Sequence, residues 1–315
     1  MSSDSSSNDA WAGFKLWYYT PSPAAAGIYA AVFALLTGYH AFRLIQRRTW
    51  FCIPFVVGGL FELIGYIARG LAHNNKDSVP IYTIQSLLLL LAPILFAASV
   101  YMILGRLVRV LHGEAYTLIR VNWLTKIFVG GDIFCFMIQG AGGGLLASAD
   151  TKAEVDRDNN IILGGLVLQI IIFCIFVAVA VVFQMRMNKR PTEAAISGPL
   201  GGAKWKRLML GLYATSVLIT TRNLFRVIEY GLGNGNYLLS HEVFLVVFDG
   251  LLMIFVLAIC VMWYDREISK GKPSKKQNAA YRLESPEAML EDGRQQNGMK
   301  KTMRHGESEP ARPWS

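Results

Sequence analysis

The sequence is poor in the residues and motifs on which most enzymes depend. It has only five histidines and four cysteines in 315 residues, and the cysteines are never spaced as a metal or redox pair. A seven-helix hydrolase would need several His and acidic side chains converging on one metal ion. The Gly-x-Ser-x-Gly, His-Glu-x-x-His and Gly-x-x-x-x-Gly-Lys-Ser/Thr patterns are also absent. These absences disfavour serine hydrolases, zinc proteases and ATPases, and we predict a protein that is not an enzyme and has no cofactor or metal.

Charged residues are also scarce, at 17%, whereas hydrophobic residues make up 53% and the mean hydropathy is +0.36. That balance is typical of a membrane protein. The net charge of +9 does not indicate nucleic acid, because Lys and Arg collect in particular loops and in the C-terminal tail. The polar, Ser-rich N-terminus has no basic stretch before the first apolar run, which argues against a cleaved signal peptide.

Several apolar stretches reach the roughly 20 residues that a helix needs to span a bilayer. The pattern predicts an all-α, polytopic membrane protein with seven transmembrane helices. The predicted helices cover 24–45, 51–71, 81–104, 123–147, 161–185, 208–230 and 242–264. Between them lie connectors that include an acidic loop at 148–160 and a basic connector at 186–207.

Basic residues alternate between the connectors and predict the orientation. The first, third and fifth connectors carry Arg47 and Arg48, then three arginines within 105–122, then six Lys and Arg residues within 186–207. The other connectors hold only Lys76, Lys152 and Arg157. The positive-inside rule therefore places the N-terminus outside and the C-terminus in the cytosol.

The same reasoning divides the chain into three parts. Residues 1–23 are expected to be a disordered extracellular segment, 24–264 the membrane domain, and 265–315 a disordered basic cytosolic tail. The tail lysines would either rest on anionic lipid of the inner leaflet or remain solvated and mainly set the topology. We expect a multi-pass protein of the plasma membrane.

Polar residues inside the predicted helices form the candidate substrate-binding site. At about 1.5 Å per residue, those of six helices lie between mid-membrane and the outer boundary. Charged groups at this depth normally face the protein interior or a wet cavity. They either line such a cavity, walled by charges that pair across helices, or act as clamps between helices. The residues are Glu62, Arg69, Gln85, Asp132, Gln139, Gln169, Arg222, Arg226, Glu229, Glu242 and Asp249.

Glycine and proline indicate where helices approach or distort. Paired glycines at 58–59, 130–131 and 164–165 let backbones come close, and the GAGGG run at 140–144 is expected either to pack tightly or to unwind the fourth helix. Pro93 should kink the third helix or free one of its carbonyls. Helices three and four are then the elements expected to move, unless these features serve packing alone.

Short motifs spread over the predicted membrane domain carry a family resemblance. They are TPS at 20–22, FELIGYIAR at 61–69, Gln85 with LAPILFAASVY at 91–101, Asp132 with Gln139 and the following glycines, IILGGLVLQ at 161–169, and RNLFRVIEYGLG at 222–233 with Glu242 and Asp249. Together they resemble the fungal lipid-translocating exporter family (RTA-like), whose founding members confer resistance to aminocholesterol or to sphingoid long-chain bases. The resemblance implies seven spans, export of amphiphiles or stress resistance, and functional roles for the polar residues named above. Ala25–Gly27 and Val243 depart from the family pattern, which leaves the substrate open.

Two functions from different classes follow. The first is a translocator or exporter of a membrane lipid or amphiphile, such as a sphingoid long-chain base or a sterol-like molecule, whose cationic headgroup meets Glu62, Asp132 or Asp249. The alternative is a seven-helix receptor or lipid-stress sensor without transport activity. The Asp-Arg-Tyr and Asn-Pro-x-x-Tyr signatures of rhodopsin-like receptors are absent, and the seventh helix has no lysine for retinal.

Overall fold

The computed structural model describes residues 22–72, 79–146, 151–198, 200–231 and 246–264. The chain divides into two compact units, Met1–Gly271 and Lys272–Ser315, and every described residue belongs to the first. The predicted basic tail, 265–315, therefore lies outside the described residues. The predicted N-terminal segment, 1–23, also lies outside them except for Ser22 and Pro23.

The described part of the chain is almost entirely helical, as the apolar runs predicted. The main helices are α1 (Pro23–Arg47), α2 (Ile53–Ala72), α3 (Val79–Val110), α4 (Val121–Leu146), α5 (Lys152–Lys189) and α7 (Ala203–Gly231). The seventh segment is described from the π-helical turn η3 (Val246–Leu251) through α10 (Leu252–Cys260) to the short turn η4 (Val261–Trp263). Six helices are long and apolar enough to cross a membrane, and Val247–Trp263 adds a shorter apolar helix. The seven-helix prediction is confirmed.

Local signals explain where the first helix begins and ends. The Ser22 side chain accepts a hydrogen bond from the Ala25 backbone N–H, and Pro23 occupies the first turn, where its missing N–H costs nothing. At the other end Arg48 adopts a left-handed conformation, with φ of 53°, and its N–H closes the helix. After Arg48, only Thr49 and the short 3-10 turn η1 (Trp50–Cys52) precede α2.

Two predictions about connectors were wrong. Thr151 and Glu154 form a reciprocal capping box, so α5 begins at Lys152 and most of the expected acidic loop at 148–160 is helical. The basic connector at 186–207 includes the end of α5, the short helix α6 (Glu193–Ile196) and the start of α7. The run at 140–144 stays within α4 and does not unwind it, and a Cβ at Gly142 would meet Ile162 and the Asp158 carbonyl of α5.

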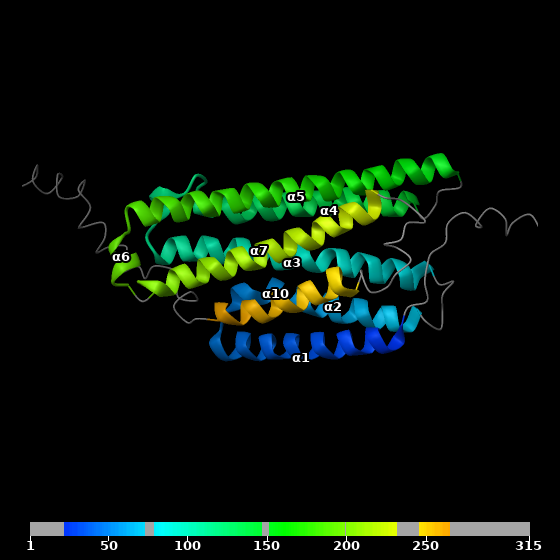
Figure 1. Cartoon of the computed structure of the whole chain (residues 1–315), viewed down its shortest axis with the longest axis horizontal. Helices are drawn as coiled ribbons and strands as arrows, with labels where there is room; N and C mark the ends of the chain where they lie inside the picture. Colours follow the sequence, from blue (N-terminus) through cyan, green and yellow to red (C-terminus); the bar gives the residue numbers. More distant parts are fainter. Residues whose placement is uncertain (1–21, 73–78, 147–150, 199, 232–245, 265–315) are drawn as a thin grey trace, which may run out of the picture. The chain divides into compact units, whose positions relative to one another are not determined.

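The helices pack in chain order, and the last one closes the bundle. From α1 to α5, each helix packs against the one that follows it, ending with α4 against α5. Helix α7 packs against both α5 and α3, and α10 lies against α7 and α1 (Figure 1). Glycines permit the close approaches that the sequence predicted. A Cβ at Gly58 would meet the Phe96 ring from α3, and one at Gly165 would meet the Gln139 side chain and the Cys135 carbonyl from α4.

Apolar side chains cover the outside of the bundle as well as its inside. Large exposed residues occur on every long helix, with Leu35, Met137 and Leu210 each about two thirds exposed or more. A soluble protein rarely presents so much contiguous apolar surface, whereas a bilayer solvates it. The charged residues of the candidate site that the structure describes show the reverse pattern, because each is buried or largely buried.

Candidate functional site

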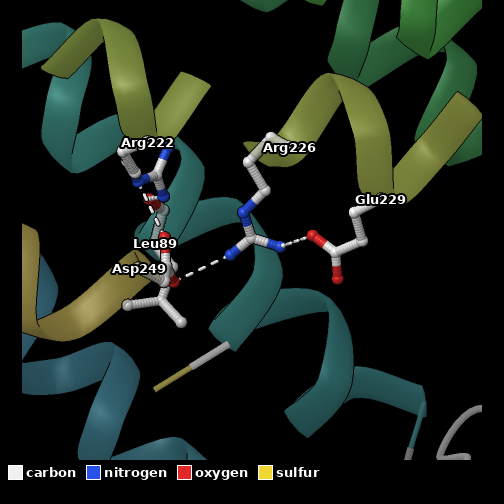
Figure 2. A network of polar contacts seen from close by, with 5 residues as sticks. All are labelled: Leu89, Arg222, Arg226, Glu229 and Asp249. Atoms are coloured by element: carbon white, nitrogen blue, oxygen red, sulfur yellow. Dashed lines mark hydrogen bonds and ion pairs between the residues drawn. The ribbon is translucent and has the colours of Figure 1, made fainter. Parts of the chain in front are cut away.

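Two arginines of α7 and one aspartate of η3 form the centre of the site. Arg222 Nε lies 2.7 Å from Asp249 Oδ1, and Arg226 Nη2 donates to Asp249 Oδ2 at 2.8 Å. Arg226 also uses Nη1 to reach Glu229 Oε2 at 3.0 Å, one turn along the same helix (Figure 2). Asp249 therefore holds two guanidinium groups at once. We call Arg222, Arg226, Glu229 and Asp249 the arginine network.

The arginine network is anchored to α3 through a backbone oxygen that a proline leaves available. Arg222 donates to the Leu89 carbonyl (Figure 2). In a regular helix this carbonyl would accept from the N–H four residues later, but that residue is Pro93, which has none. The expectation that Pro93 frees a carbonyl therefore holds, and the freed carbonyl binds an arginine from another helix.

Asp249 occupies an irregular turn that brings it inward. It lies in the π-helical segment η3 and is completely buried. The next residue, Gly250, has no side chain, and a Cβ there would collide with Tyr66 and with the Tyr29 ring. The tight contact of Gly250 with these rings explains how η3 approaches α1 and α2 closely at this point. Single π-helical turns are frequent at functional sites.

Glu62 of α2 is the unusual member of the cluster. Its side chain is 0% exposed, and neither carboxylate oxygen has a hydrogen-bond partner among the residues that the structure describes. The charges that act on it are those of Asp249, Arg222 and Arg226. One helical turn further, the Tyr66 hydroxyl is likewise buried without a described hydrogen-bond partner, while its ring stacks on Tyr29. Glu62 thus lies beside the arginine network without a contact to it.

Other predicted residues meet in a second group, between α3, α4 and α5. Asp132 accepts a hydrogen bond from the Tyr101 hydroxyl at 2.8 Å, and Gln139 donates to Gln169 at 2.9 Å. Arg222 is held by Asp249, whereas Asp132 binds Tyr101, whose ring packs against other aromatic rings, including Phe176. The predicted residues therefore form two groups, and those of the arginine network contact one another directly.

Three residues of the predicted substrate-binding site remain, and the structure describes two of them. Arg69 is buried on α2, and its charge acts on Asp249 and on Tyr66. Gln85 is buried on α3, and its Oε1 atom has no hydrogen-bond partner in the described part of the chain. Glu242 lies outside the described residues.

Sequence reasoning missed two tyrosines, and it predicted a free carbonyl without naming its residue or its partner. Tyr66 lies four residues after Glu62, a helical spacing that places both on one face and was available as a signal. The Leu89 carbonyl was likewise marked by Pro93 four residues later. Tyr101 carried no comparable signal, because its contact with Asp132 depends on how α3 and α4 rotate against each other.

The chemistry available to this arrangement is that of charge and proton exchange. The described residues contain no group of three His, Cys, Asp or Glu side chains that could hold a metal ion. They do contain two buried carboxyl groups, on α2 and η3, beside two arginines of α7. Such a set can bind an ionic headgroup, bind a proton, or redistribute ion pairs among three segments.

Comparison with known proteins supports the family that the sequence motifs indicate. Residues 55–272 match the family model described as RTA1 like protein. Protoporphyrin uptake protein 1 of Saccharomyces cerevisiae is 32% identical over 78% of this chain and 90% of its own length. Protein RTM1 is 34% identical over 74% of this chain and 73% of its own length, and sphingoid long-chain base transporter RSB1 is 24% identical over 76% and 71%. No solved structure matches the chain. The chain therefore belongs to the RTA1-like family of multi-pass membrane proteins.

Proposed function

We propose that this protein translocates or exports a lipid or amphiphile across the membrane, without ATPase activity. The observation that carries the proposal is the buried carboxyl group of Glu62, which lies beside the arginine network with no hydrogen-bond partner among the described residues. A set of charges that served only to clamp helices would be expected to satisfy all its members. Glu62 instead offers an unoccupied acceptor to an incoming group.

The chemistry of the cluster favours an amphiphile with a charged headgroup. Asp249 is already saturated by two guanidinium groups, so Glu62 is the acid that a cationic headgroup would engage. Arg222 and Arg226 would hold the acids in place or receive an anionic group. The exposed apolar surface of the helices leaves room for the acyl chain to stay in lipid. Among the relatives, one is named as a transporter of sphingoid long-chain bases and another as a protoporphyrin uptake protein, which supports this class of substrate.

Transport of labelled sphingoid long-chain base into vesicles that contain the purified full-length protein tests the proposal. The Glu62→Gln and Asp249→Asn variants should lose most of the flux, because the first removes the acceptor and the second releases both arginines. Asp132→Asn is the matched control, since it makes the same chemical change as Asp249→Asn in the second group and should retain more activity. Wild-type vesicles that move no amphiphile, with the protein folded, would refute a translocator and favour a sensor that needs a cytosolic partner.

The orientation is a further part of the proposal. The basic connectors support an N-terminus outside and a C-terminus in the cytosol, in the plasma membrane. In this orientation the arginine network lies toward the outer leaflet. Labelling of single cysteines placed at either end of the chain by an impermeant reagent, in intact cells, tests it: the N-terminal cysteine should react and the C-terminal one should not, whereas the opposite pattern would overturn the orientation.

A further inference from the structure

Two buried acids on different segments face one pair of arginines, and only one of the acids is bound. Asp249 on η3 takes Arg222 at 2.7 Å and Arg226 at 2.8 Å. Glu62 on α2 lies within the electrostatic reach of the same arginines, yet takes neither. The two acids therefore differ in their contacts, although the same two arginines lie near both of them.

The contacts of the arginines show that their charge is already balanced. Arg226 is shared between Asp249 and Glu229, and Arg222 between Asp249 and the Leu89 carbonyl. Two guanidinium groups thus face two carboxylates before Glu62 is counted. The remaining cation, Arg69, lies two turns along α2 from Glu62 and acts on Asp249 and Tyr66.

An ionised Glu62 would be a third carboxylate in this group without a contact of its own. A buried charge that is neither paired nor hydrogen bonded is strongly unfavourable, and the group takes up a proton instead. The groups that face Glu62 are Asp249 from η3 and the two arginines from α7, while Tyr66 on its own helix and Tyr29 of α1 lie further along the same seam. None of the described groups donates a hydrogen bond to it.

We propose that Glu62 is a proton-binding site: its carboxyl group is protonated while Asp249 holds both arginines, and it releases its proton to water when an arginine transfers from Asp249 to Glu62. The transfer breaks one ion pair and forms another, so the number of buried ion pairs is unchanged. It replaces one of the two ion pairs between α7 and η3 by an ion pair between α7 and α2. The site does not depend on the identity of the amphiphile, and it would serve a transporter or a sensor equally.

Infrared spectroscopy of the purified full-length protein in lipid bilayers at neutral pH tests the protonation state. The wild-type spectrum should show the C=O stretching band of a protonated carboxyl group, and Glu62→Gln should lose that component. Glu229→Gln makes the same substitution at a half-buried, ion-paired residue and should keep it. If the difference between wild type and Glu62→Gln instead shows the bands of an ionised carboxylate, the proposal is overturned.

The transfer of the arginine has its own test in Asp249→Asn. With Asp249 neutral, an arginine should pair with Glu62, and the protonated band that Glu62→Gln removes should disappear from this variant too. Persistence of that band in a folded Asp249→Asn protein would overturn the exchange.

A chemical measurement on the wild-type protein covers the case in which a variant fails to fold. Dicyclohexylcarbodiimide is apolar and reacts with protonated carboxyl groups inside membranes. Mass spectrometry should find Glu62 modified and Asp249 unmodified at neutral pH. Modification of Asp249 with Glu62 untouched would reverse the assignment and refute it. Because neither measurement involves flux, loss of the proton site and loss of transport are distinguishable.

Discussion

Because Asp249 and Glu62 have different roles, replacing each of them should lower the free energy of unfolding by a different amount, and the two losses should be coupled. In Asp249→Asn the two arginines lose their shared carboxylate, and breaking a buried ion pair by removing one partner typically costs about 3–5 kcal/mol. Glu62→Gln replaces a neutral acid by an amide of almost the same shape, so we expect a loss of less than about 1.5 kcal/mol. In folded units of about 150–250 residues, a range that includes the predicted membrane domain at 24–264, each kcal/mol shifts the melting temperature by about 2–4 °C. The full loss at Asp249 would then lower it by about 6–20 °C.

The double variant shows whether Glu62 can replace Asp249. If an arginine turns to Glu62 in Asp249→Asn, that variant keeps part of its stability, and adding Glu62→Gln removes the substitute. The free energy of unfolding of the double variant should then fall by more than the sum of the two single losses, with a coupling of about 0.5–3 kcal/mol.

Thermal unfolding of the purified full-length protein, followed by tryptophan fluorescence, measures all three variants. Asp132→Asn is the matched control, because Asp132 is equally buried but, among the described residues, accepts a hydrogen bond only from the Tyr101 hydroxyl. Its loss should be about 0.5–1.5 kcal/mol. A Glu62→Gln variant as unstable as Asp249→Asn would refute the reasoning, since Glu62 would then be an ionised partner of the arginines.

Three further substitutions, two of them with control variants, test contacts between helices. Gly165→Ala should overpack the α4–α5 contact and lower the melting temperature, with a loss of about 1–3 kcal/mol in unfolding free energy. Gly164→Ala, with open space around it, should not lower the melting temperature. Equal effects of the two variants would contradict the packing. His40→Phe removes hydrogen bonds to the hydroxyl of Tyr264 and to a carbonyl of α10, each 3.0 Å long. In the same melts the free energy of unfolding should fall by about 1–3 kcal/mol, which is more than in Tyr264→Phe. Pro93→Ala supplies an N–H to the Leu89 carbonyl, which binds Arg222 of α7. The melting temperature should therefore rise while vesicle flux falls. Unchanged flux would show that this carbonyl has no role in transport.

The local composition of the chain determined much of the architecture. Runs of about 20 apolar residues have one stable form in a bilayer, because a helix satisfies its own backbone hydrogen bonds. The seven segments could therefore be predicted, and so could the shared face of Arg222, Arg226 and Glu229, which follows from helical spacing. The early start of α5 was also readable from Thr151 and Glu154, but the acidic composition around them favoured a loop.

The tertiary structure alone decided which charges meet. Asp132 and Asp249 are both acids in apolar helices, and nothing in their neighbourhoods along the chain says that the first meets Tyr101 and the second two arginines. That choice depends on how each helix is rotated and shifted against its neighbours, which glycines such as Gly250 and the π-helical turn at Asp249 control. Glu62 has no hydrogen-bond partner among the described residues for the same reason: the arginines near it are already bound by Asp249, by Glu229 and by the Leu89 carbonyl.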